Sequence, residues 1–138
     1  MLVIVILALM QVGFFAACDP VSVPVDTADS SSVTRAFEKQ QRDVQVQGEG
    51  VVTGILSDDK SGIPHQRFVV KLSSGHTVLV QHNTNLAPRI TALNEGDTVS
   101  FSGEYVWNEQ GGLIHWTHHD PAGRHAAGWV KHRGHIYQ

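Results

Sequence analysis

The sequence predicts an all-β domain with a small helical contribution, in which a short helix precedes a five-stranded, OB-like Greek-key barrel. Five short runs of alternating apolar residues follow one another, and a longer connection separates the third run from the fourth. Gly48 and Gly50 interrupt the first run, where such a barrel must bend its first strand to use it in both sheets. Another small barrel and an open meander are the alternatives.

Local patterns predict the individual elements. A helix is expected over 33–43, because Ser32 can cap its start and apolar residues recur near helical spacing. The first strand is expected over 44–56, with a bulge or sharp bend at its glycines. The other strands are expected over 67–72, 76–82, 98–107 and 113–118. In the fourth of the five strands, Val99 and Phe101 alternate after a Gly-Asp turn, so both should be core residues.

Length and composition favour one folded domain. The chain has 138 residues, of which 41% are hydrophobic and 17% charged, and this composition argues against a disordered chain. A formal charge of −3 disfavours a strongly basic nucleic-acid binder. A single cysteine excludes an intramolecular disulfide and a cysteine-rich zinc module. Nine histidines are the one unusual count.

The N-terminal segment predicts export. Residues 1–10 are uninterruptedly apolar, and after Gln11 the apolar character resumes and ends in small residues, which is the pattern of a secretory signal. The run Phe-Ala-Ala-Cys at 15–18 resembles the lipobox of bacterial lipoproteins, in which the cysteine becomes the lipidated first residue of the mature chain. We therefore expect lipidation at Cys18. An uncleaved membrane anchor and an ordinary cleaved signal are the alternatives, and all three export the domain.

Three regions follow from this interpretation. Residues 1–18 form the signal segment with its lipobox, 19–32 form a flexible tether, and 33–138 form the OB-like domain with a histidine-rich C-terminal tail. Pro, Ser, Asp and Thr dominate the tether, and no apolar period is sustained there. The lipid would attach the domain to a membrane of the bacterial cell envelope, facing the periplasm or the cell exterior.

The tail contains the densest group of potential metal ligands. Six of the nine histidines lie within 115–135, and imidazole is the commonest metal ligand. The expected set is His118, Asp120 and His125, brought together by the turn between them, and His119 can replace His118. Two histidines and a carboxylate could hold zinc or iron with positions left open. The alternative is structural, with rings packed on tryptophans and the Asp120 carboxylate accepting N–H groups of a turn.

A second candidate site would bind a ligand at one rim of the barrel. Its members are His65, Arg67, Asn83 and Arg89. The first two begin one expected strand, and the asparagine follows the hairpin partner of that strand, so the groups could converge. The planar guanidinium fork suits a carboxylate or a phosphate. The alternative is that an arginine forms an ion pair, for example with Asp97 or Glu104.

Four runs of residues resemble a known family. They are Gly-Ile-Pro-His-Gln-Arg-Phe at 62–68, His-Asn at 82–83 with Leu-Ala-Pro-Arg-Ile at 86–90, Gly-Glu-Tyr at 103–105 with Trp-Asn at 107–108, and His-Trp-Thr-His-His-Asp-Pro at 115–121. Through them, roughly residues 43–138 resemble a bacterial domain-of-unknown-function family of short exported proteins. The resemblance implies a single small bacterial domain, and it implies no activity and no catalytic residue.

The sequence favours a binding module over an enzyme. It contains no Gly-x-Ser-x-Gly elbow, no P-loop and no dinucleotide fingerprint. We expect an exported, lipid-anchored β-barrel whose ligand is a small anion, a peptide or an envelope protein, and nucleic acid is not expected. The alternative is a metal-dependent hydrolase acting on a phosphodiester, in which the histidine and aspartate set holds the ion and Glu104 activates water.

Overall fold

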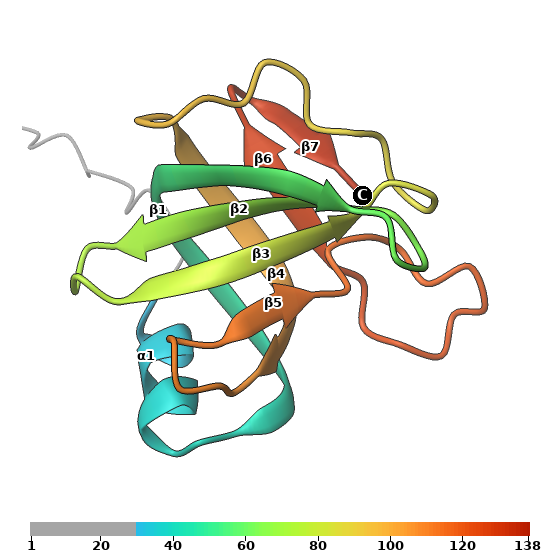
Figure 1. Cartoon of the computed structure of the whole chain (residues 1–138). Coiled ribbons are helices and arrows are strands. Elements are labelled where there is room, and N and C mark those ends of the chain that lie inside the picture. Colours follow the sequence, from blue (N-terminus) through green and yellow to red (C-terminus); the bar gives the residue numbers. More distant parts are fainter. Residues whose placement is uncertain (1–29) are drawn as a thin grey trace, which may run out of the picture.

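The computed structural model describes residues 30–138 as one short helix followed by seven strands (Figure 1). The helix is α1 (Ser31–Glu38), and the strands are β1 (Arg42–Asp59), β2 (His65–Leu72), β3 (Thr77–Asn83), β4 (Thr98–Val106), β5 (Leu113–His115), β6 (Trp129–His132) and β7 (His135–Tyr137). The predicted signal segment, Cys18 and most of the predicted tether lie outside the described residues. Within 30–138, no helix has the length and apolar character needed to cross a bilayer.

The strands form a single sheet in which five of them close into a ring. The strand order is β1-β2-β3-β5-β4-β6-β7, and an additional pairing between β1 and β4 closes the ring. Only the β3–β5 pairing is parallel among the described strands. The predicted mostly-β fold with one short helix is therefore confirmed, and all five predicted strands are present.

β1 reaches both neighbours in the ring because it is long enough to pair with each in turn. Its first half pairs with β4 and its second half with β2, and Gly50 and Val51 pair with both. A Cβ at Gly48 would lie 2.6 Å from the Phe101 ring, and one at Gly50 would collide with the carbonyl oxygen of Lys71. These glycines thus allow close approach where β1 passes from one partner to the other.

A bulge or sharp bend was expected at these glycines, but the register of β1 shifts further along the strand. The register shifts between Val52 and Gly54, so the faces to which side chains point exchange there. Val52 pairs with the buried Val70, whereas Leu56 pairs with Arg67 on the outer surface. This shift places an apolar side chain of β1 on the outside of the ring.

The core fills the ring and is covered at one end by α1 (Figure 1). Its buried members are Val33, Ala36, Val46, Val52, Phe68, Val70, Leu72, Val78, Val80, Ile90, Val99, Phe101, Tyr105, Ile114 and Val130. Alternation along each strand places these side chains inside, so the predicted burial of Val99 and Phe101 is confirmed. The Gln66 amide donates to the Ile90 carbonyl and accepts from its N–H, which secures the 84–97 connection over the core.

Two expected boundaries are wrong, and two strands were not expected. The helix runs from Ser31 to Glu38, not over 33–43, and the Ser32 hydroxyl donates to the Gln47 carbonyl instead of capping it. The fifth predicted strand ends at His115, not at residue 118, because Trp116 takes a φ of 53° that ends the alternation. The C-terminal tail, which lies beyond the five predicted strands, forms β6 and β7 beside β4.

Candidate functional site

A row of partly exposed apolar side chains crosses the outer surface of β2, β3 and β5. Val69 pairs with Leu79, and Leu79 pairs with Leu113. Each of the three points outward because its chain neighbours are buried in the core. We call this surface the β2–β3–β5 face, defined by the outward side chains of those strands. It places apolar groups side by side in a position where water still reaches them.

A shallow hollow of about 200 Å³ lies on this row. Its lining comprises Leu56, Val69, Thr77, Val78, Leu79, Asn108, Gln110 and Gly112. The 108–112 turn that forms one rim is held in place, since the Asn108 carboxamide oxygen accepts the N–H groups of Gln110 at 2.9 Å and Gly112 at 3.0 Å. The hollow therefore has an apolar floor and a rim of fixed amide groups.

A second, polar row runs beside the apolar one. Arg67 pairs with Gln81, and His115 pairs with Glu104. The Arg67 Nε donates to the Ser57 carbonyl at 2.9 Å, which holds the arginine stem along the sheet. The polar row thus begins with a cation on β2 and ends with a carboxylate on β4.

Two imidazoles bond to the carboxylate at the end of the polar row. Glu104 Oε1 lies 3.0 Å from His115 Nε2, and Glu104 Oε2 makes a short hydrogen bond with His125 Nε2. The His125 ring also stacks on Trp116, with a centroid distance of 4.1 Å and an interplanar angle of 11°. His125 lies on the 116–128 segment, which loops out beyond β5 in Figure 1, so these contacts fasten that segment to β4.

These contacts set the charges of the cluster. Burial would raise the pKa of Glu104, but the bonds and charges of His125 and His115 lower it below its usual value. The bond to Glu104 raises the pKa of His125, against the effect of burial. Both ring nitrogens of His125 face acceptors, since Nδ1 lies 2.8 Å from the Ala126 carbonyl oxygen. Neutral imidazole has only one N–H, so the geometry suits the doubly protonated ring.

The predicted metal ligands lie near one another but do not form a group that could hold a metal ion among the described residues. Asp120 accepts backbone N–H groups from Ala122 at 2.9 Å, Arg124 at 2.8 Å and His125 at 2.9 Å, which is the structural alternative considered for it. His118 is buried, and its Nδ1 lies 2.6 Å from the His119 carbonyl oxygen. The His119 side chain is exposed. Among residues 30–138, no group of three or more His, Cys, Asp or Glu could hold a metal ion. The zinc or iron hypothesis, and the hydrolase that depends on it, gain no support from this arrangement.

The second predicted set is brought together in part. His65 and Asn83 pair directly, and Arg67 follows on the same outer surface of β2. The Asn83 carboxamide oxygen accepts the N–H groups of residues 85 and 86, so it starts the connection that follows β3. Arg89 instead forms an ion pair with Asp58 at 2.5 Å. Asp97 and Glu104, the ion-pair partners considered for an arginine of this set, pair with neither Arg67 nor Arg89. Their partners are given by the structure as His132 and Arg133 for Asp97, and His115 and His125 for Glu104.

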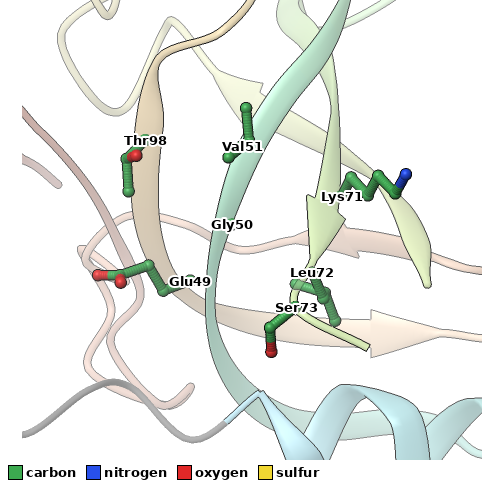
Figure 2. A pocket seen from close by; sticks show the side chains of 7 residues that line it. All are labelled: Glu49, Gly50, Val51, Lys71, Leu72, Ser73 and Thr98. Carbon is green, nitrogen blue, oxygen red and sulfur yellow. The ribbon is translucent and has the colours of Figure 1, made fainter. Parts of the chain in front are cut away.

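Another hollow, of about 320 Å³, lies where β1 passes from β4 to β2 (Figure 2). Glu49 and Thr98 border one side, and Lys71 borders the other with its ammonium group directed away (Figure 2). The Glu49 carboxylate accepts a hydrogen bond from the Ser100 hydroxyl at 2.7 Å. Since its polar groups do not converge, this hollow is a weaker candidate than the β2–β3–β5 face.

Sequence reasoning missed how Glu104 is used. It was considered as a partner for an arginine or as an activator of water, and the structure bonds it to His115 and His125. The pairing of β4 with β5 brings the first of these histidines to it, and the 116–128 segment brings the second. A carboxylate at an outward strand position opposite a histidine was the one available signal.

The fold and the site together define a small domain built on a five-strand ring, with an apolar and a polar row on its outer surface. The chain belongs to the family described as "Protein of unknown function (DUF3465)", which matches residues 15–138. The predicted resemblance to a family of unknown function is confirmed at that level. No curated protein shows significant similarity to the chain.

Proposed function

We propose that this protein is an exported, lipid-anchored binding module of the bacterial cell envelope, built on an OB-like Greek-key barrel, that takes its ligand on the β2–β3–β5 face. The ligand is a small anion, a peptide or a segment of an envelope protein. The observation that carries the proposal is the apolar row of Val69, Leu79 and Leu113 beside the polar row that begins at Arg67.

The strand arrangement supports the OB-like part of the proposal. A ring in the order β1-β2-β3-β5-β4, closed through β1 and with β3 and β5 parallel, is the order expected of that barrel. OB-folds bind their ligands on the face of the second and third strands and in the neighbouring loops. The hollow next to the 108–112 turn occupies that part of the molecule. Because one fold serves many functions, the fold alone does not imply binding, and the surface itself supplies the support for it.

The grouping of the exposed apolar side chains supports binding. Single apolar residues on a surface are ordinary, but a contiguous group rimmed by polar residues is typical of an interaction site. Here the three side chains are in register across neighbouring strands, and two of them, Val69 and Leu79, line a hollow. A ligand that covers this row would remove apolar area from water. The protein would lose little conformational entropy, because strand positions are already rigid.

Export and anchoring rest on the N-terminal pattern alone. The apolar segment ends in Phe-Ala-Ala-Cys at 15–18, and the polar stretch 19–29 separates it from α1. A Cys18→Ser change should abolish labelling of the protein by a radioactive fatty acid in the bacterial host. Labelling that persists in this variant would contradict lipidation at Cys18.

Photo-crosslinking from within the face tests the binding proposal. A benzophenone amino acid replaces Leu79 in the full chain, and in a control it replaces Lys131, an exposed residue of β6. After irradiation of whole cells, mass spectrometry of the purified protein detects any organic adduct, from a small molecule to a protein. We expect a defined adduct from position 79 and none from position 131. No adduct at 79, or the same adducts at both positions, would contradict the proposal.

A further inference from the structure

β2 presents two cations on its outer surface, one on each side of Val69. Arg67, Val69 and Lys71 alternate with the buried Phe68 and Val70. Within residues 30–138, neither Arg67 nor Lys71 forms an ion pair with a carboxylate. Asp59 feels the charge of Arg67, but its carboxylate is bonded to Ser61. Two cations without an ion-pair partner thus flank an apolar position on one strand.

We propose that the β2–β3–β5 face binds an extended acidic peptide, in which carboxylate side chains flank an apolar one. This inference rests on the proposed function and names the ligand class for the same face. Positions two apart on a strand lie about 7 Å apart, so Arg67 and Lys71 are about 13 Å apart with Val69 midway. An extended peptide repeats the same spacing. A pattern of acidic, any, apolar, any, acidic therefore matches the two cations and the apolar residue between them.

The hollow suits the apolar side chain of such a peptide. Its floor includes Val69 and Leu79, and its volume of about 200 Å³ exceeds the roughly 150 Å³ in which an engineered cavity accepts benzene. The rim supplies amides at Asn108 and Gln110, which can bond to a peptide backbone. A free inorganic anion would use the cations and leave this apolar floor exposed to water, so the whole surface fits a peptide better.

The charges around the face also favour an acidic ligand. Glu104 is the one carboxylate of the polar row, and His115 and His125 both bond to it. The Arg67 hydrogen bond to the Ser57 carbonyl of β1 uses Nε, so the two Nη groups of the guanidinium can donate to a ligand carboxylate. An acidic side chain at Arg67 therefore meets a cation that one hydrogen bond positions, and the nearest competing carboxylate, Asp59, is bonded to Ser61.

A single-stranded nucleic acid is also an anionic polymer, but the face lacks what would hold its bases. Binding of single strands combines cations with aromatic rings on which bases stack. The outward positions of β2, β3 and β5 hold His65, Arg67, Val69, Lys71, Thr77, Leu79, Gln81, Leu113 and His115. None of these is Phe, Tyr or Trp, so the aliphatic surface favours a peptide.

Fluorescence anisotropy with defined peptides tests the inference on the full-length protein in detergent. The probe is a fluorescein-labelled peptide, Glu-Thr-Leu-Thr-Glu, with Gln-Thr-Leu-Thr-Gln and Lys-Thr-Leu-Thr-Lys as controls. We expect the acidic peptide to bind at least tenfold more tightly than either control, and added salt to weaken it. Arg67→Gln and Lys71→Gln should each weaken binding several-fold. The matched change Lys131→Gln, on β6, should leave it unchanged.

Several outcomes would overturn the inference. Equal binding of the three peptides would remove the role of the carboxylates, and unchanged binding in Arg67→Gln and Lys71→Gln would remove the site. Tighter binding of labelled oligothymidylate than of the acidic peptide would assign the face to nucleic acid. A crosslink from position 79 without acidic-peptide binding overturns only this inference, whereas failure of both experiments overturns the proposed function as well.

Discussion

His82 and His125 each have two hydrogen-bonded ring nitrogens, but their partners differ in what they can donate. His82 is fully buried at the end of β3, where Nε2 lies 3.0 Å from the Pro88 carbonyl and Nδ1 lies 2.7 Å from the Thr117 hydroxyl. The carbonyl only accepts, so Nε2 carries the proton, and the hydroxyl can donate to Nδ1. Burial lowers the pKa of His82, although the carbonyl opposes this, and the ring stays neutral.

His125 shows the opposite case on the outer surface. Its two nitrogens face the Ala126 carbonyl and the Glu104 carboxylate, neither of which can donate. The bond to Glu104 raises the pKa of His125, so the ring holds a second proton more strongly. The two histidines therefore differ because their partners differ. His82 has a partner that can donate to one ring nitrogen and suits a neutral ring, whereas His125 has two acceptors and suits a protonated one.

Removing the buried ring should have the largest effect. His82→Ala leaves the Thr117 hydroxyl and the Pro88 carbonyl without their partner inside the protein and also opens a cavity. We expect a loss of about 3 kcal/mol in the free energy of unfolding, measured by urea denaturation. His135→Ala, at an exposed position of β7, should change it by less than about 0.5 kcal/mol. A loss below about 1 kcal/mol in His82→Ala would show that the buried hydrogen bonds contribute little.

Disturbing the segment that carries His125 should have a smaller effect. A Cβ at Gly128 would collide with the carbonyl oxygens of Trp116 and Ser102, so Gly128→Ala must displace the end of the segment. We expect a loss of about 2 kcal/mol, as for an overpacked site. Gly62→Ala is the matched control, since nothing lies within 4 Å of the added carbon there. Equal melting temperatures for the two variants would mean that the close packing at Gly128 relaxes freely.

The two rings should give pH dependences of opposite sign. The pKa of His82 is lowered in the folded state, so its contribution is complete above the ordinary value of 6.5 and is lost as the pH falls below it. The pKa of His125 is raised, so its contribution is complete below 6.5 and is lost as the pH rises through the folded pKa. For this partly exposed ion pair we expect an effect below about 1 kcal/mol.

His125→Gln isolates the pH dependence of stability that His125 contributes. The stability difference between the wild type and His125→Gln should be largest near pH 5.5 and should shrink above pH 7, as measured by urea denaturation across that range. A difference that grows with rising pH would contradict the protonated His125. Thr117→Val should leave the pH dependence contributed by His125 unchanged, because the Thr117 hydroxyl bonds to His82.

The elements that the sequence predicted are those whose signal is local. Val99 and Phe101 alternate after a turn, and such alternation depends only on strand geometry. The end of β5 was not predictable in this way, because Trp116 takes a positive φ that its residue type does not favour. β6 and β7 were missed because they are short and lie in a tail rich in Gly and His, where apolar residues show no sustained period.

The candidate site was predictable only where strand neighbours define it. The pairing of His65 with Asn83, and the place of Arg67 on the same surface, follow from a hairpin that the sequence indicated. The bonds of Glu104 depend on partners 11 and 21 residues away, and the spacing alone does not fix those distances. Asp120 was correctly identified as a possible turn acceptor, because the Asp-Pro-Ala-Gly run carries that signal by itself.

The long β1 strand has a consequence for how the molecule folds. Its second half meets β2 through a nearby turn, but its first half pairs with β4, as in Arg42 with Val106. Chains are synthesised from the N-terminus, so the first half of β1 has an unpaired edge until β4 has been synthesised. Distant pairing of this kind slows folding, and an open edge invites pairing between chains. Gly48 and Gly50 lie in this half of β1, where glycine reduces the tendency to form intermolecular β-structure before the ring closes.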